Sequence, residues 1–137
     1  MKIEDKMAIQ ELLGRAAYGY DERKLDLLTQ CFTEDAVMTV RIEGRDPIRP
    51  FEGHQAIMKL MTRSMEKQTD RRLHDISNIF FETEGEESAT VVSSLTLQGV
   101  ENGNIRLISN GYYRDEVVKV GDRWKVRRRH LDLRLPS

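Results

Sequence analysis

An aspartate and a histidine that lie far apart in the sequence could together transfer a proton. Asp21 follows a predicted helix, whose negative dipole end disfavours a lone carboxylate. His74 lies in a predicted strand and shares a face with Ile76, Asn78 and Phe80, so we expect it to point inward. A carboxylate that binds an imidazole fixes its tautomer and stabilises the imidazolium, so a histidine held by an acid can act as a general base. The alternative is that Asp21 caps a turn and His74 is an ordinary core histidine.

Two tyrosines lie close to this aspartate. Tyr18 and Tyr20 stand near the end of the same predicted helix. A phenol can donate a hydrogen bond to a carbonyl or enolate oxygen, or protonate a leaving hydroxyl group. Both are therefore candidate catalytic residues, and packing of their rings against the core is the alternative.

The last predicted strand raises a question of parity. Trp124 and Val126 share one face of a regular strand, whereas the leucines that follow share the other. A bulge between the two groups would reconcile them. With one inserted residue, Arg129 points inward and could bind an anionic or carbonyl group; without it, Arg128 and His130 would do so. A solvated basic edge is the remaining interpretation.

Other residues could line an apolar pocket around these groups. Aromatic side chains and adaptable thioethers suit such a lining, and core packing is the alternative for each. The remaining substrate-binding candidates are Phe51, Met61, Asn78 and Trp124. His54, His74 and His130 lack the spacing of metal ligands, and no nucleotide-binding motif occurs, so we expect no metal and no cofactor.

Helices that precede a long run of strands must position these side chains. Apolar residues at spacings of three and four, and alternating or β-branched segments, define the elements. Helices are predicted at Ile3–Tyr20, Lys24–Phe32 and Ala56–Gln68, and strands at Ala36–Ile42, Arg71–Thr83, Ser88–Val100, Ile105–Val120 and Arg123–Leu135. This order predicts a single α+β domain over residues 1–137, in which a curved antiparallel sheet packs against three N-terminal helices and leaves a cavity.

Two segments carry a family resemblance. YGYDERKLDLLTQCFTEDAVMTV near the start and GYYRDEVVKVGDRWKVRRRHLDL near the end resemble the SnoaL-like branch of the nuclear transport factor 2-like superfamily. The resemblance spans nearly the whole chain and implies a cone-shaped, cystatin-like fold with a pocket for a small molecule. A fold of this kind hosts several reactions, so it does not by itself fix one.

The resemblance also implies a chemistry. Within that superfamily this sequence is similar to three kinds of lyase: scytalone dehydratase, the bile-acid dehydratases and hexachlorocyclohexane dehydrochlorinase. These enzymes pair an aspartate at the end of helix 1 with a histidine on the strand after helix 3. Asp21 and His74 match those two positions, which implies that His74 is the base and Asp21 its orienting partner. Tyr20 with Asp21 resembles the Tyr-Asp step of scytalone dehydratase. Two features depart from the pattern: Ala16 stands where bile-acid dehydratases have a tyrosine, and residues 97–100 offer no second histidine or acid.

The function so implied is a cofactor-free lyase, isomerase or cyclase that acts on a small hydrophobic, cyclic substrate. One alternative is a binding domain without catalysis. The other is a structural subunit like the small subunits of ring-hydroxylating dioxygenases, whose counterpart of RRLHDISN also carries a histidine and an asparagine.

Charge and cysteine content limit which partners and which cellular compartment we expect. The 22 basic and 23 acidic residues give a net charge of -1, so we expect neither nucleic acid nor a membrane as partner. Cys31 is the only cysteine and we see no signal peptide, so we expect a cytoplasmic protein. Surplus apolar strand residues predict a homodimer or homotrimer through the outer sheet face: Val91, Leu95, Leu97, Ile105 and Leu107.

Overall fold

The computed structural model describes all residues from 1 to 137, which form three helices and six strands. The helices are α1 (Ile3–Asp21), α2 (Leu25–Thr29) and α3 (His54–Lys67). The strands are β1 (Phe32–Ile42), β2 (Phe51–Glu52), β3 (Arg71–Glu84), β4 (Ser88–Glu101), β5 (Asn104–Val120) and β6 (Arg123–Leu133). The predicted α+β order is confirmed. None of the helices is long and apolar enough to span a membrane.

The second helix is shorter than predicted, and the first strand is longer. Helix α2 ends at Thr29, and Phe32 already belongs to β1, where it pairs with Val126 of β6. The Val126 amide donates to the Cys31 carbonyl oxygen at 2.8 Å. Hydrogen bonds to a distant strand therefore replace the last helical turn that the local apolar pattern favoured.

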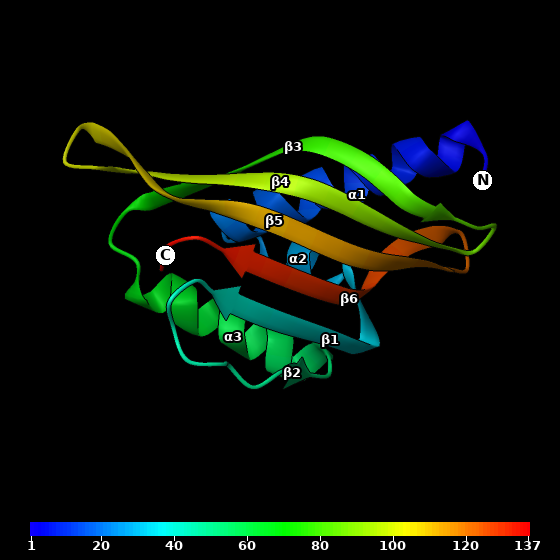
Figure 1. The fold of residues 1–137 in the computed structure, drawn as a ribbon, viewed down its shortest axis with the longest axis horizontal. Coiled ribbons are helices and arrows are strands. Elements are labelled where there is room, and N and C mark those ends of the chain that lie inside the picture. The colour runs from blue at the N-terminus through cyan, green and yellow to red at the C-terminus, as the bar shows by residue number, and fades with distance from the viewer.

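The six strands form one curved sheet in the order β2-β1-β6-β5-β4-β3. Strands β3 to β6 are consecutive antiparallel neighbours, as predicted, and β1 pairs with β6 in parallel. Figure 1 shows α1 behind the strongly bent long strands and α3 alongside β1, and α1 also contacts β3 and β6. The helices therefore cover the inner face of the sheet.

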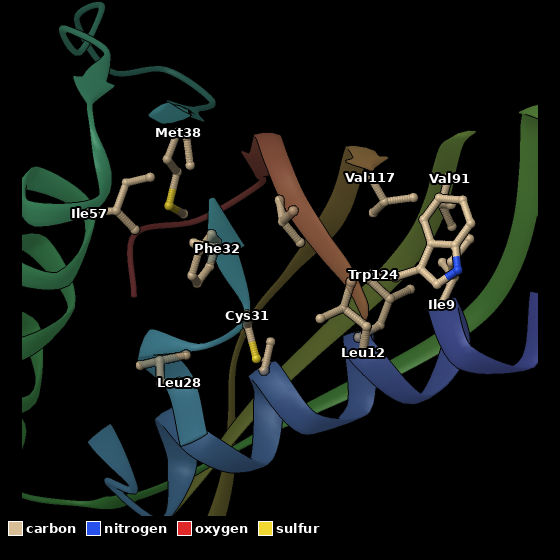
Figure 2. Close-up of a cluster of buried hydrophobic side chains, with 14 of the residues drawn as sticks. Ile9, Leu12, Leu28, Cys31, Phe32, Met38, Ile57, Val91, Val117 and Trp124 are labelled. Atoms are coloured by element: carbon tan, nitrogen blue, oxygen red, sulfur yellow. The ribbon is translucent and has the colours of Figure 1, made fainter. Parts of the chain in front are cut away.

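The main core lies between the three helices and the inner sheet face. Leu12, Leu28 and Phe32 are each almost fully buried there, and burial of one such side chain stabilises the fold by about 1.5–3 kcal/mol. In Figure 2, Trp124 lies among Ile9 and the valines of β4 and β5. This core fixes the end of α1 relative to the sheet.

A bulge in β6 decides which basic side chain faces inward. Glu116 of β5 pairs with Arg128, but the next residue, Val117, pairs with Val126, so Arg127 is the inserted residue. Arg129 is consequently buried, with 7% of its surface exposed, whereas Arg128 is exposed. The bulge that the sequence suggested is therefore confirmed, and Arg129 is the inward arginine.

A second bulge, in β3, was not predicted. Ser77 pairs with Ser94 but Phe80 pairs with Val92, and Asn78 takes a left-handed backbone conformation with φ of 50°. Before the bulge the even-numbered side chains of β3 face inward, and after it the odd-numbered ones do. Asn78 and Phe80 are exposed, so the expectation that they share the inward face of His74 was wrong.

The outer face of the sheet also differs from expectation. Val91, Leu95 and Leu97 point inward and are buried, whereas Ile105 and Leu107 are exposed at 72% and 76%. Leu97 of β4 pairs with Ser109 of β5, but the next residue, Gln98, pairs with Leu107. This inserted residue in β5 turns Leu107 and Ile105 to the outer face. The apolar part of the outer surface consists of Ile105 and Leu107 together with other exposed, outward-facing side chains: Leu73, Phe80, Val100 and Tyr112.

Candidate functional site

A cavity of about 240 Å³ lies between α1, α3 and the inner sheet face. Its lining is mostly apolar, which suits a small hydrophobic molecule. The lining residues are Leu13, Ala16, Ala17, Tyr20, Leu28, Met38, Val40, Ile42, Ile48, Phe51, Leu60, Met61, Ser64, His74, Ile76, Tyr113, Arg129, Leu131, Leu133 and Ser137. Of the residues singled out from the sequence, Tyr20, His74, Arg129, Phe51 and Met61 are among them.

Asp21 and His74 are in direct contact at the edge of this cavity. His74 Nδ1 lies 2.6 Å from Asp21 Oδ1, and the His74 backbone amide donates to Asp21 Oδ2 at 2.8 Å. Both side chains are largely buried, with 13% and 5% of their surfaces exposed. The last residue of α1 therefore holds both the backbone and the ring of a single residue of β3.

This contact fixes the chemical form of the imidazole. An ionised carboxylate only accepts hydrogen bonds, so the proton of a neutral His74 ring resides on Nδ1. The other ring nitrogen, Nε2, carries the lone pair and has no hydrogen-bond partner within the protein. A ring in this state, at the wall of a cavity, is available to accept a proton from a bound molecule.

Tyr20 packs directly against the histidine. The two rings meet edge to face with their centroids 4.8 Å apart. The Tyr20 hydroxyl accepts a hydrogen bond from Gln68 Nε2 at 2.8 Å. Burial raises the pKa of Tyr20 above its ordinary value, although this hydrogen bond opposes the rise. Tyr20 therefore holds the imidazole ring in place and keeps its own proton at neutral pH.

A second polar group lies on β5 and β6. Arg129 donates to Asp115 through Nε at 2.8 Å and Nη2 at 3.1 Å, and no part of the Asp115 surface is exposed. The Arg129 guanidinium carbon lies 4.0 Å from the centroid of the Tyr113 ring. Burial disfavours the charge on Arg129, but the facing carboxylate raises its pKa. Arg129 is therefore a charged side chain whose charge is neutralised by Asp115.

Three of the candidates lie away from the cavity. Tyr18 is 55% exposed, because a residue two positions from Tyr20 is rotated by about 200° around the helix. Trp124 belongs to the core, where its Nε1 donates to Asp5 at 3.0 Å. Asn78 is exposed on the β3 bulge, and its amide reaches Ser94 Oγ at 3.4 Å. The structure therefore places neither the candidate catalytic residue Tyr18 nor the candidate substrate-binding residues Trp124 and Asn78 at the cavity.

Tyr113 and Asp115 were not identified from the sequence. Their inward orientation depends on the register of β5 against both neighbours, which includes two irregularities. One signal was present: an inward Arg129 requires a buried acid on an adjacent strand, and Asp115 alternates with Tyr113 and Val117 in a segment of otherwise apolar inward positions. No group of three or more histidine, cysteine, aspartate or glutamate side chains is arranged to hold a metal ion.

The sequence and the fold were compared with those of known proteins. The family model of the SnoaL-like domain matches residues 1–130. No curated protein sequence matches the chain significantly. The predicted cystatin-like fold is confirmed by solved structures that bear this description.

Three solved structures, all from Novosphingobium aromaticivorans, are similar over nearly the whole chain. A candidate aromatic-ring hydroxylase is 28% identical with a TM-score of 0.83, and the match covers 99% of this chain and 93% of that one. A candidate scytalone dehydratase is 24% identical with a TM-score of 0.82, covering 97% and 86%. The β subunit of a candidate aromatic-ring-hydroxylating dioxygenase is 13% identical with a TM-score of 0.82, covering 99% and 94%.

Proposed function

Because the chain belongs to the SnoaL-like domain family, we propose that residues 1–137 act as one domain and catalyse a cofactor-free lyase, isomerase or cyclase reaction. The substrate is a small hydrophobic molecule that contains a ring. The observation that carries the proposal is the contact between His74 and Asp21 at the wall of an apolar cavity. The resemblance to a candidate scytalone dehydratase agrees with it at the level of the fold.

The common first step of these reactions is removal of a proton from carbon. His74 Nε2 accepts the proton while the electron pair of the broken C–H bond moves into the substrate. The positive charge that forms on the imidazole is stabilised by Asp21, whose carboxylate lies 2.6 Å from Nδ1. The apolar walls exclude water, so the attraction between imidazolium and carboxylate is stronger than in solution.

The steps after proton removal distinguish the reaction classes. In a lyase, a leaving group departs from the neighbouring carbon with its bonding pair. In an isomerase, the proton returns at a different carbon. Tyr20 packs on the imidazole and supports its orientation in either case.

The absence of a second inward acid or histidine on β4 keeps two alternatives open. Leu97 of β4 stands opposite His74, and residues 97–100 include no histidine and no acid. A domain that only binds its ligand, or a structural subunit like the dioxygenase β subunit, would use the same cavity or the same sheet without turnover. Both alternatives predict that no reaction depends on His74.

Assembly and location form the rest of the proposal. The exposed Ile105 and Leu107 favour a homodimer or homotrimer through the outer face of the sheet. The net charge of -1 favours neither nucleic acid nor a membrane as partner. The lone cysteine, Cys31, suits a reducing compartment such as the cytoplasm.

Proton exchange tests the proposed base with simple ketones in place of the natural substrate. A panel of one- and two-ring ketones, including β-tetralone, is incubated with the protein in deuterium oxide, and loss of acidic C–H signals is followed by NMR. His74→Ala should reduce exchange by about 10²–10⁴-fold, the usual contribution of a general base. Asp21→Asn should reduce it less, because the imidazole remains but loses its charged partner.

The matched control is His130→Ala. His130 lies on the outer sheet face, where Nδ1 is 2.6 Å from Thr39 Oγ1, so its removal should leave exchange unchanged. Exchange that persists at the wild-type rate in folded His74→Ala protein would refute the base. Binding of the ketones without exchange in the wild-type protein would also refute it and favour the binding domain.

A further inference from the structure

The cavity has a polar wall that the proposed base does not use. Tyr113 of β5 lines the cavity, yet its hydroxyl makes no hydrogen bond within the protein. The residue is buried, with only 5% of its surface exposed. Its hydroxyl is not among the fully buried polar atoms that lack a partner, so the hydroxyl oxygen is accessible and a ligand or water can complete its hydrogen bonding. The cavity is where such a partner would lie.

Three neighbours hold the Tyr113 ring in one position. The guanidinium of Arg129 lies over the ring, 4.0 Å from its centroid, and is itself fixed by Asp115 through two hydrogen bonds. Leu95 and Leu133 pack against the ring from strands β4 and β6. The phenol is thus preorganised by groups that do not themselves need to touch a ligand.

The ionisation state of Tyr113 suits a hydrogen-bond donor. Burial raises its pKa to about 12, against the opposing effect of the Arg129 guanidinium. The phenol therefore keeps its proton at neutral pH. A cation over the ring face also draws electron density from the ring, which strengthens the hydroxyl as a donor.

The charges around the cavity restrict the ligand. Arg129 is neutralised by Asp115, and the His74 ring is paired with Asp21, so the cavity wall offers no uncompensated positive charge. A carboxylate or phosphate would enter such a cavity at a large desolvation cost. A neutral carbonyl oxygen needs only a hydrogen-bond donor, and Tyr113 supplies one.

We propose that Tyr113 donates a hydrogen bond to the carbonyl oxygen of the substrate, and that the substrate is a small, uncharged ring ketone. This inference rests on the proposed function. When His74 Nε2 takes the proton next to the carbonyl, the C–H electron pair forms a carbon–carbon double bond and the carbonyl pair moves onto oxygen. Tyr113 keeps its proton and stabilises the resulting enolate through the same hydrogen bond. Arg129 and Asp115 act as positioning residues for Tyr113.

Binding of an enol mimic tests the donor independently of catalysis. β-Naphthol has the two-ring skeleton of β-tetralone and carries an enol-like hydroxyl. Tyr113→Phe should weaken its binding by about tenfold, the usual value for loss of one hydrogen bond, while the ring and its stack on Arg129 remain. Tyr112→Phe is the matched control, because Tyr112 is the adjacent residue but lies half-exposed on the outer face.

Infrared spectroscopy gives a second, direct readout. The carbonyl stretch of isotope-labelled β-tetralone should shift to lower frequency when it binds the wild-type protein, and this shift should disappear in Tyr113→Phe but not in Tyr112→Phe. In the proton-exchange assay, Tyr113→Phe should lower the turnover rate by about 10²–10³-fold with little change in KM.

Several results would overturn the inference. Equal β-naphthol affinity in the wild-type and Tyr113→Phe proteins would exclude the hydrogen bond. If β-naphthoate, the corresponding carboxylate, binds as tightly as β-naphthol, the substrate class is not restricted to uncharged molecules. If the wild-type protein binds neither β-naphthol nor β-tetralone, the uncharged ring ketone is excluded as substrate. His74→Ala should bind β-naphthol as tightly as the wild-type protein. The binding assay therefore tests the hydrogen bond from Tyr113 separately from the proposed role of His74 as base, which the exchange assay tests.

Discussion

Removal of the charge on Asp115 should destabilise the protein far more than the same change in an exposed ion pair. Arg129 and Asp115 form a bidentate pair at 2.8 and 3.1 Å, and Arg114 and Glu82 form one at 2.8 and 2.9 Å. The main difference is burial, since Asp115 has no exposed surface and the pair of Arg114 and Glu82 lies on the outer face. Asp115→Asn and Glu82→Gln therefore compare one geometry in two environments.

The expected magnitude follows from that burial. Asp115→Asn leaves the Arg129 guanidinium charged and buried, which costs about 3–5 kcal/mol in comparable cases. With a urea dependence of about 2 kcal/mol per M, a loss of about 4 kcal/mol lowers the unfolding midpoint by about 2 M. Glu82→Gln should leave the midpoint unchanged within error, because water already solvates that pair.

Fluorescence of Trp124 during urea unfolding provides the assay. Trp124 is the only tryptophan and is buried in the core, so its emission reports loss of packing. Asp115→Leu combined with Arg129→Met should recover most of the loss, because no buried charge then remains unpaired. Equal midpoints for Asp115→Asn and Glu82→Gln, or a double variant less stable than Asp115→Asn, would refute the reasoning.

Two further predictions concern backbone packing and assembly. Gly111→Ala should destabilise the protein by at least about 2 kcal/mol, because the new methyl group would overlap the Asp132 carbonyl oxygen of β6, whereas Gly14→Ala, with open space around it in α1, should stabilise by about 0.5–1 kcal/mol. Thermal unfolding measures both, and a neutral Gly111→Ala would contradict the close strand approach. Light scattering should give two or three times the monomer mass of 15.9 kDa, and Leu107→Glu should lower it; a monomer at micromolar concentration would remove the proposed assembly.

Most elements and the positions of the two principal site residues could be predicted from the sequence, and the family resemblance implied the contact between them. The apolar spacing of α1 placed Asp21 at a helix end, and a short stretch of regular strand placed His74 inward. Both inferences depend only on local geometry over a few residues. Phe51 and Met61 were identified for the same reason, since apolar residues next to or within an amphipathic helix tend to face a common interior.

Several errors arose where orientation depends on a distant strand. Asn78 and Phe80 were assigned to the inner face because alternation was carried through a bulge that no local residue type announces. Ile105 and Leu107 were grouped with Leu97 because the shift between β4 and β5 is invisible without both strands. A single inserted residue reverses every later side chain of a strand.

The family resemblance implied the pairing of Asp21 with His74, and the sequence left a bulge in β6 as one of two alternatives. The sequence by itself determined the α+β order of elements, the long strands, a helix end at Asp21 and an inward side for His74. Each depends on residue types and on periods of two or 3.6 residues, which act locally. The tertiary structure alone decided that Tyr113, Arg129 and Asp115 form one buried unit beside the cavity. The physical reason is that strand register sets which side chains share a face, and register results from hydrogen bonds between residues far apart in the chain.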